Sequence, residues 1–299
     1  MSYITMTGLG QSGGLCSQLQ TYASLAAVAK ANNKKIVFTK EDLKGDVVKY
    51  HTGEDYQTMV RVFDLLDIHC EVVPKSFLKD FVDKQINFHT TTYDETLFEL
   101  NSNQNYNLVG RFDLYTYWYN DIGNEVADWK FKDALQKQAE SRMADIKKHF
   151  GNDKPTVSIH VRRGDYLLPN HHFAILDSDY YETAVVENFW HPLDYNFVVF
   201  SNDIPYCREM LYGDNVWFVE PNGGEKVCSD SEKEDLALLS LCDHHIIANS
   251  SYSWWGAFLS KNKDKKIICP TNWLKKYHPS SWINGRYYPP TWTNIDNIA

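Results

Sequence analysis

The chain has few cysteines, no excess of basic residues and no long apolar run, and each absence excludes a class of protein. Its 6 cysteines among 299 residues form no C-x-x-C pair and no doublet at zinc-ligand spacing, so we expect reduced thiols. A balance of 30 basic against 39 acidic residues argues against a general nucleic-acid binder. Without a secretory pattern or a window of about 18 apolar residues, we expect a soluble, cytoplasmic protein.

What is present is the composition of a folded chain, with 43% hydrophobic and 23% charged residues. A length of 299 residues favours two domains. Segment 151–155, Gly-Asn-Asp-Lys-Pro, is the best candidate linker, which predicts domains over 1–150 and 151–299. The aromatic share of 14% is high; such rings belong mostly to cores, but they also stack on sugars.

The N-terminal half opens with a strand–loop–helix–strand pattern over residues 3–38, which predicts a parallel sheet. Gly13 and Gly14 lie in the loop before the helix. They serve either as a tight structural turn or as a loop that holds a ligand at the helix start. Further along, the pattern predicts a helix over 54–66, a strand over 112–119 and a helix over 128–150.

The C-terminal half alternates strands with helices. Strands are predicted over 156–161, 196–200, 215–219, 244–248 and 265–269, with helices over 178–190, 204–212, 231–242 and 252–261. This alternation is typical of a doubly wound α/β sheet, in which ligands bind beyond the carboxyl ends of the strands.

Polar and basic residues follow three of these strands. Arg162 and Arg163 come after the first, beside Asp165, and two guanidiniums at a strand end suit a phosphate; an interdomain salt bridge is the alternative. Asn202 and Asp203 follow the next strand and can cap a helix. The hydroxyls of 250–253, Ser-Ser-Tyr-Ser, open a helix whose free amides can hold a phosphate.

Two histidine pairs, at 171–172 and 244–245, raise the question of a metal site. Adjacent residues on a strand point to opposite faces, and supporting ligands at fitting distances are needed as well. We therefore expect neither a metal nor another cofactor, so that cationic side chains neutralise a leaving diphosphate.

Four motifs together carry a family resemblance. Residues 160–166, His-Val-Arg-Arg-Gly-Asp-Tyr, resemble the H-x-R-R-x-D signature of α1,2-, α1,6- and protein O-fucosyltransferases. Segments 235–239, 249–257 and 13–23 are similar to motifs of the α1,2-fucosyltransferase family, in its bacterial branch. The resemblance therefore extends from residue 13 to residue 257.

The resemblance implies a GT-B fold, with two Rossmann-like doubly wound domains facing a cleft, the second binding the donor GDP-fucose. The implied reaction transfers L-fucose, with inversion and without a metal, to the 2-hydroxyl of a terminal galactose in a lipopolysaccharide, O-antigen or oligosaccharide glycan. A lipid-linked acceptor would imply peripheral association with the inner membrane. The alternatives are another nucleotide sugar or fucosyl linkage, and a non-catalytic glycan-binding protein.

The resemblance also implies roles for individual residues. Arg162 and Asp165 are the expected catalytic residues, Arg162 on the β-phosphate and Asp165 supporting its loop. The expected donor-binding residues also include His160, Arg163, Asn202, Asp203, Asp235, Ser250, Ser251, Tyr252 and Ser253. Gly13, Gly14 and Gln18 are expected to contact acceptor or donor.

The sequence departs from the family pattern at two places. Cys16 and Ser17 replace the usual Gly-Asn of the N-terminal loop. Asn170 occupies the position at which related α1,6 enzymes carry their proposed base. The base therefore stays unassigned among Asp165, Asp177, Asp179 and a carboxylate of the N-terminal domain.

Overall fold

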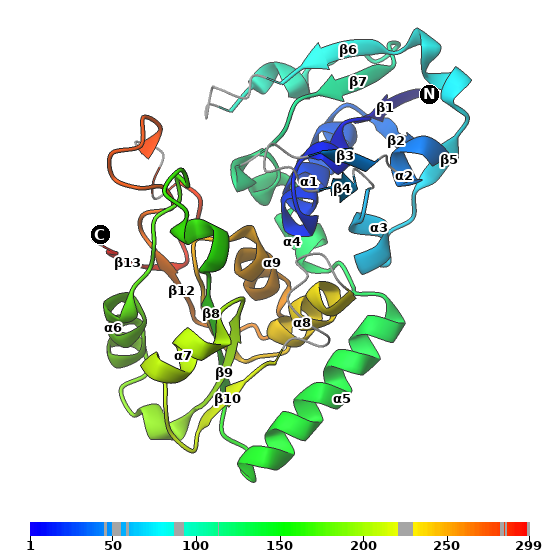
Figure 1. The fold of residues 1–299 in the computed structure, drawn as a ribbon. Helices are drawn as coiled ribbons and strands as arrows, with labels where there is room; N and C mark the ends of the chain where they lie inside the picture. The colour runs from blue at the N-terminus through cyan, green and yellow to red at the C-terminus, as the bar shows by residue number, and fades with distance from the viewer. Residues whose placement is uncertain are drawn as a thin grey trace. The chain divides into compact units, whose positions relative to one another are not determined.

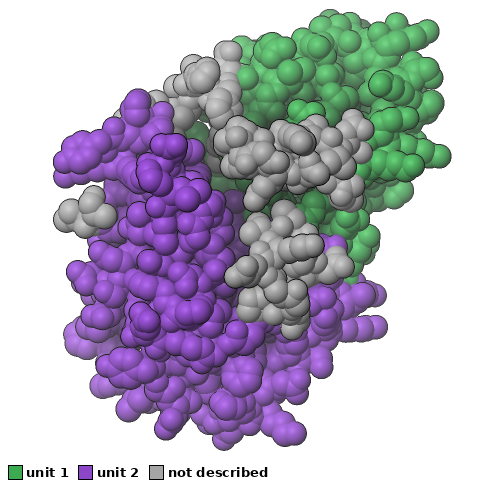
Figure 2. All heavy atoms as spheres, viewed as in Figure 1, with its two compact units in different colours: residues 1–132 green, residues 133–299 purple. Residues whose placement is uncertain are grey.

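The computed structural model describes residues 1–44, 47–49, 55–57, 60–86, 93–112, 114–220, 230–281, 284 and 286–297. The chain forms two compact units, residues 1–132 and 133–299 (Figure 2). The predicted boundary, at 150/151, lies at the end of helix α5 (Asp133–Phe150), whereas the structure places this helix in the second unit. The reason is that α5 packs along α8 (Asp230–Ser240) of that unit.

The first unit contains a five-stranded sheet in the order β5-β2-β1-β7-β6, with every pair of neighbours parallel. Its strands are β1 (Ser2–Thr5), β2 (Lys34–Thr39), β5 (Glu71–Val73), β6 (Val82–Gln85) and β7 (Tyr106–Val109). An antiparallel pair joins β3 (Val47–Lys49) and β4 (Asp55–Gln57). The helices are α1 (Leu15–Ala31), α2 (Lys40–Lys44), α3 (Val62–Leu65) and α4 (Tyr119–Ala127), with 3₁₀ turns η1 (Leu9–Gln11), η2 (Lys75–Asp80), η3 (Glu95–Phe98) and η4 (Tyr115–Tyr117).

The second unit contains a six-stranded parallel sheet in the order β10-β9-β8-β11-β12-β13. Its strands are β8 (Thr156–Val161), β9 (Asn196–Ser201), β10 (Val216–Phe218), β11 (His244–Ile246), β12 (Ile267–Pro270) and β13 (Thr293–Ile295). The remaining helical segments are α6 (Ser178–Asn188), α7 (Ile204–Met210), α9 (Ser251–Leu259), η5 (Gly164–Leu167) and η6 (Pro192–Asp194). Helices α6 and α7 cover one face of the sheet and α8 and α9 the other (Figure 1).

Strand β8 forms the centre of this sheet because its sequence, Thr-Val-Ser-Ile-His-Val, is β-branched or apolar at most positions and buried at all of them. Tyr180 and Tyr181 of α6 are fully buried in the same core. The chain order of the strands reverses between β8 and β11, so this is the point of a doubly wound sheet where a ligand crevice is expected. The predicted fold class is confirmed.

Three predictions of secondary structure were wrong. The segment 112–119 is not a strand: Asp113 lies outside the described residues, and the rest leads through η4 into α4. The helix predicted from 128 begins at Asp133, because Phe131 bridges to Leu66 in a strand-like pairing. The segment 54–66 contains β4 and α3; residues 54, 58 and 59 lie outside the described residues.

Two expectations about the whole chain concern cysteines and membranes. Cys16, Cys70, Cys207, Cys242 and Cys269 are free thiols, and Cys228 lies outside the described residues. Among the helices of the described part of the chain, none has the length and apolarity needed to cross a bilayer.

Candidate functional site

The three polar segments predicted from the sequence meet at one edge of the second sheet. Strand β8 pairs in parallel with β9 through Val161 and Ser201, and with β11 through Ile159 and Ile246. The carboxyl ends of these strands therefore lie side by side, and the segments 162–166, 202–203 and 249–253 follow them. Tyr166 in the first segment donates a hydrogen bond to the carbonyl of Asn249 in the third, at 3.1 Å.

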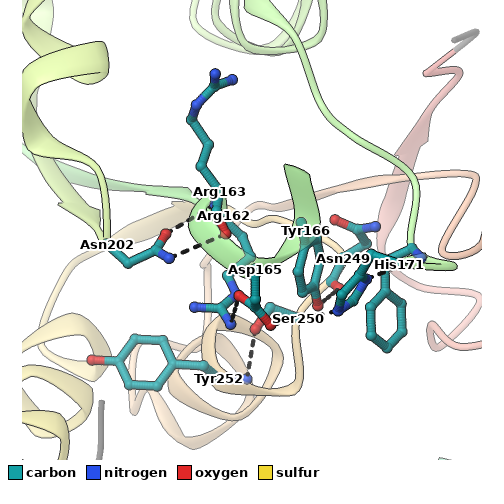
Figure 3. A network of polar contacts seen from close by, with 10 residues as sticks. Arg162, Arg163, Asp165, Tyr166, His171, Asn202, Asn249, Ser250 and Tyr252 are labelled. Atoms are coloured by element: carbon teal, nitrogen blue, oxygen red, sulfur yellow. Dashed lines mark hydrogen bonds and ion pairs between the residues drawn. The ribbon is translucent and has the colours of Figure 1, made fainter. Parts of the chain in front are cut away.

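Arg162 is held by two neighbours from its own loop (Figure 3). Its Nη2 donates to Oδ1 of Asp165, and its guanidinium lies 5.0 Å from the centre of the Tyr166 ring. The side chain is 21% exposed, against 48% for Asp165. Arg162 is thus restrained on one side while part of its guanidinium remains accessible.

Asn202 fixes the backbone of the arginine loop. Its Oδ1 accepts from the amide of Arg163 at 2.9 Å, and its Nδ2 donates to the carbonyl of the same residue at 3.1 Å. Gly164 follows with a φ of +63°, and a Cβ at this position would lie 2.5 Å from the Asn202 Nδ2. Glycine suits this position for two reasons: it adopts the left-handed backbone readily, and it has no Cβ to collide with the side-chain amide of Asn202.

The second arginine has partners of its own. Nε of Arg163 donates to Oδ2 of Asp203 at 3.2 Å, and its guanidinium lies 3.6 Å from the centre of the Tyr206 ring. Asp203 also caps α7 by accepting from the amide of Tyr206. Arg163 is thus bound at the start of α7. Figure 3 shows that the side chains of Arg162 and Arg163 point in different directions.

Helix α9 begins at the carboxyl end of β11. Ser250 is its N-cap residue, and its Oγ accepts from the amide of Tyr252 at 3.4 Å. The helix is anchored by its apolar side, because Trp254 and Trp255 are buried. Ser251 and Tyr252 are half-buried in the first turn. The first turn of a helix carries partial positive charge, so this turn is suited to an anion.

His160 and Ser253 lie beneath this surface. His160 Nδ1 and Ser253 Oγ form a hydrogen bond of 2.8 Å, and both side chains are buried. Burial, with the nearby charge of Arg162, lowers the pKa of His160 from its ordinary value of 6.5 to about 3. The imidazole is therefore neutral at physiological pH and joins the end of β8 to the start of α9.

Asp235 lies on α8 and forms an ion pair with α5, a contact that was not predicted from the sequence. Its Oδ1 accepts from Nη1 of Arg142 on α5 at 2.6 Å. Burial raises the pKa of Asp235, while the positive charge of Arg142 opposes that rise. This ion pair joins the two helices, and the expected role of Asp235 in donor binding stays a prediction.

The N-terminal glycine loop is braced by Gln18. Its amide Nε2 donates to the carbonyls of Gly10 and Gly13 at 3.3 and 3.4 Å, and its Oε1 accepts from the amide of Arg61 at 2.8 Å. Gly14 is the N-cap residue of α1. Gln18 is fully buried and holds the loop in shape. The predicted contact with acceptor or donor stays a prediction.

Two features of the second unit were not predicted from the sequence. Asp177-Ser178-Asp179 is a D-x-D triplet, in which Asp177 is the N-cap of α6 and accepts from the amide of Tyr180. His171 lies 3.5 Å from Asp165, with its Nε2 toward Oδ2. The only sequence signal for His171 was its pairing with His172, which we interpreted as part of a strand; the two rings instead stack at 5.3 Å outside any strand.

In the described ranges, no group of three or more His, Cys, Asp or Glu side chains is arranged to hold a metal ion. On β11, His245 is buried against Ser158 Oγ at 2.8 Å, whereas His244 is half-buried. The expectation of a metal-free site stays a prediction.

Comparison with known proteins gives one family. Residues 68–296 match the model of Glycosyl transferase family 11. An Escherichia coli protein named O-antigen biosynthesis glycosyltransferase WbnK is 36% identical over 143 residues, which are 43% of this chain and 44% of that protein. An Escherichia coli alpha-1,2-colitosyltransferase is 35% identical over 155 residues, covering 47% and 48%. The chain thus spans about half the length of these relatives.

A longer match and a solved structure extend the comparison. Galactoside alpha-(1,2)-fucosyltransferase 2 of Bos taurus is 24% identical over 260 residues, which are 83% of this chain and 67% of that protein. The crystal structure of POFUT1 in complex with GDP superposes with a TM-score of 0.52 at 12% identity, covering 90% of this chain and 98% of that one. At this identity the likeness concerns the fold alone, and it agrees with the predicted GT-B fold.

Proposed function

The chain belongs to Glycosyl transferase family 11, and from this membership we propose that it transfers L-fucose from GDP-β-L-fucose to the 2-hydroxyl of a terminal galactose. The product is an α1,2 linkage formed with inversion. The acceptor is a glycan of the lipopolysaccharide, O-antigen or oligosaccharide type, in line with the names of relatives in Escherichia coli and Bos taurus. We place the reaction in the cytoplasm, with peripheral association at the inner membrane when the acceptor is lipid-linked.

One observation carries this proposal: a restrained, partly exposed guanidinium and the N-terminus of a helix follow adjacent strands of one sheet. Arg162 follows β8, and the first turn of α9 follows β11, the strand paired with β8. A diphosphate lying between them meets a fixed cation on one side and backbone amides on the other. This arrangement supports a nucleoside diphosphate leaving group.

The chemistry follows from where charge develops. As the bond between the fucose C1 and the β-phosphate oxygen breaks, negative charge accumulates on that phosphate and the sugar becomes oxocarbenium-like. A donor already fixed at the phosphate stabilises this transition state more than the ground state. Asp165 and Tyr166 restrain Arg162 before the substrate arrives, so little reorganisation is needed. Arg163, bound to Asp203, holds the loop in place.

The acceptor hydroxyl loses a proton as it attacks C1. Of the three candidates in the second unit, Asp165 already accepts from Arg162, and Asp177 accepts from a backbone amide. Asp179 has a weaker partner in the described part of the chain, because its Oδ1 accepts from Ser178 Oγ at the long distance of 3.5 Å. We therefore propose Asp179 as the first carboxylate to test as general base.

A second donor is favoured by one relative. The alpha-1,2-colitosyltransferase of Escherichia coli acts, by its name, on colitose, a sugar that differs from fucose by lacking the 3-hydroxyl. A comparison of turnover with GDP-fucose and GDP-colitose decides between the two donors. A site that hydrogen-bonds the 3-hydroxyl prefers GDP-fucose strongly, because the deoxy sugar leaves that partner unsatisfied.

The decisive experiment is incubation with GDP-fucose and a panel of β-galactosides, followed by linkage analysis of the product. Fucose on O2 of galactose supports the proposal, whereas no product with any galactoside contradicts it. Calorimetric titration separates the remaining alternatives. Binding of GDP but not UDP supports a guanosine donor, UDP binding indicates another nucleotide-sugar transferase, and glycan binding without nucleotide binding indicates a lectin.

A further inference from the structure

Asp165 lies between two donors. One carboxylate oxygen, Oδ1, accepts from Arg162, and the other, Oδ2, lies 3.5 Å from Nε2 of His171. The other ring nitrogen of His171, Nδ1, accepts from the backbone amide of Phe173 at 3.4 Å. In the neutral ring, Nδ1 is therefore the acceptor and Nε2 carries the hydrogen, which is directed at Asp165.

His171 also contacts the second residue that holds Arg162. Its ring stacks on Tyr166 at 4.6 Å with an interplanar angle of 27°, and the other ring contact of Tyr166, Phe173, lies at 4.7 Å. Tyr166 in turn lies under the Arg162 guanidinium and is fixed by its hydrogen bond to Asn249. His171 thus touches both neighbours of Arg162 (Figure 3).

A pair between Arg162 and Asp165 alone would be a weak restraint. Asp165 is 48% exposed, and ion pairs open to solvent contribute about 0 to 1 kcal/mol, which leaves the two side chains free to change rotamer. A third group that fixes the carboxylate removes this freedom. His171, whose side chain is 17% exposed, is placed to do so.

We propose that His171 is a positioning residue for Arg162: it orients Asp165 through Nε2 and supports Tyr166 through its ring, so that the guanidinium is fixed for the departing β-phosphate. This inference rests on the proposed function. His171 does not itself take the acceptor proton, because one nitrogen donates toward Asp165 and the other accepts from the backbone.

The surroundings favour the neutral form of His171. Burial lowers its pKa, and the charges of Arg162 and Lys275 lower it further, while Asp165 opposes them. The ring also lies against Tyr166, His172 and Phe173. The neutral ring has one donor and one acceptor, and both are used by the contacts described above.

Two substitutions separate the donor from the ring. His171→Phe keeps a ring for Tyr166 but has no donor for Asp165, and His171→Gln keeps an amide donor near the place of Nε2 but has no ring. We expect His171→Phe to lower kcat about 10- to 100-fold, the cost of a misplaced catalytic group, with GDP affinity changed less than about threefold. His171→Gln should recover most of that kcat.

His172→Phe is the matched control, because that ring lies against His171 and His278 and should leave kcat near the wild-type value. Melting temperatures identify any variant that fails to fold. Wild-type kcat in His171→Phe, or an equal loss in His171→Gln, overturns the inference. A wild-type enzyme that transfers no fucose overturns the proposed function, and the inference with it, so the two failures are distinguishable.

Discussion

Gly164 offers a direct test of how the arginine loop is built. We consider Gly164→Ala, with Gly151→Ala as its matched control, because both glycines have a φ of +63° and both lie in the second unit. A Cβ at Gly151 meets nothing within 4 Å, whereas at Gly164 it lies 2.5 Å from Nδ2 of Asn202. The two variants share the backbone strain and differ in the contact with Asn202.

The expected magnitudes follow from this difference. A left-handed alanine costs about 1 kcal/mol of unfolding free energy in each variant. In Gly164→Ala the amide of Asn202 must also move away from the Arg163 backbone, which it now binds at 2.9 and 3.1 Å. Because Asn202 is exposed, each bond is worth about 0.5 kcal/mol, so Gly164→Ala should be less stable than the control by about 1 kcal/mol.

Turnover gives the sharper measurement. Loss of the two hydrogen bonds from Asn202 to Arg163 displaces the loop that carries Arg162. We therefore expect kcat with GDP-fucose to fall about 10²-fold in Gly164→Ala and to stay near the wild-type value in Gly151→Ala. Urea unfolding of both variants, followed through the second unit's transition, supplies the free energies. Equal stability and equal kcat in the two variants would refute the role given to Asn202.

Further predictions address charge and proton transfer. Arg162→Ala should lower kcat at least about 10²-fold, and Arg162→Lys should not restore it because a point charge lacks the planar fork; near-normal turnover at saturating donor contradicts this. His160 has a pKa of about 3 in the folded protein, so below pH 6.5 the unfolded chain takes up a proton that the folded protein does not, and the free energy of unfolding falls. By pH 5 the loss is about 2 kcal/mol. In urea titrations at several pH values, His160→Gln should weaken this pH dependence. Asp179→Asn should keep GDP binding but lose transfer and the acidic limb of the pH–rate profile; full activity excludes it as base. Turnover should be unchanged in EDTA, and a requirement for Mg²⁺ would contradict the metal-free mechanism.

The sequence was sufficient for the doubly wound order of the second unit. Long buried strands such as β8 have a strong β-branched pattern, and the chain order of strands and helices restricts how they connect. It was not sufficient for β13, whose three residues show no alternation and form the edge of the described sheet beside β12. Residues 115–119 were misassigned because the rings on either side of Thr116 suggest a strand-like alternation, although the backbone forms a 3₁₀ turn and a helix.

The location of the candidate site could be predicted from the sequence, but the side-chain contacts within it could not. Strand ends identified Arg162, Asn202 and Ser250, since parallel strands bring their carboxyl ends to one edge. The partners of these residues depend on side-chain directions that spacing does not encode. Thus the divergence of the two arginines and the contact of His171 with Asp165 required the structure.

The pairing of α5 with α8 determines where this chain can be cut. A recombinant fragment beginning at residue 151 would lack Arg142 and leave the mostly buried carboxylate of Asp235 without its counter-charge, as well as uncovering the side of α8 that α5 now covers. A fragment that starts ahead of Asp133 retains both helices. Expression trials of the C-terminal half should therefore use the earlier start.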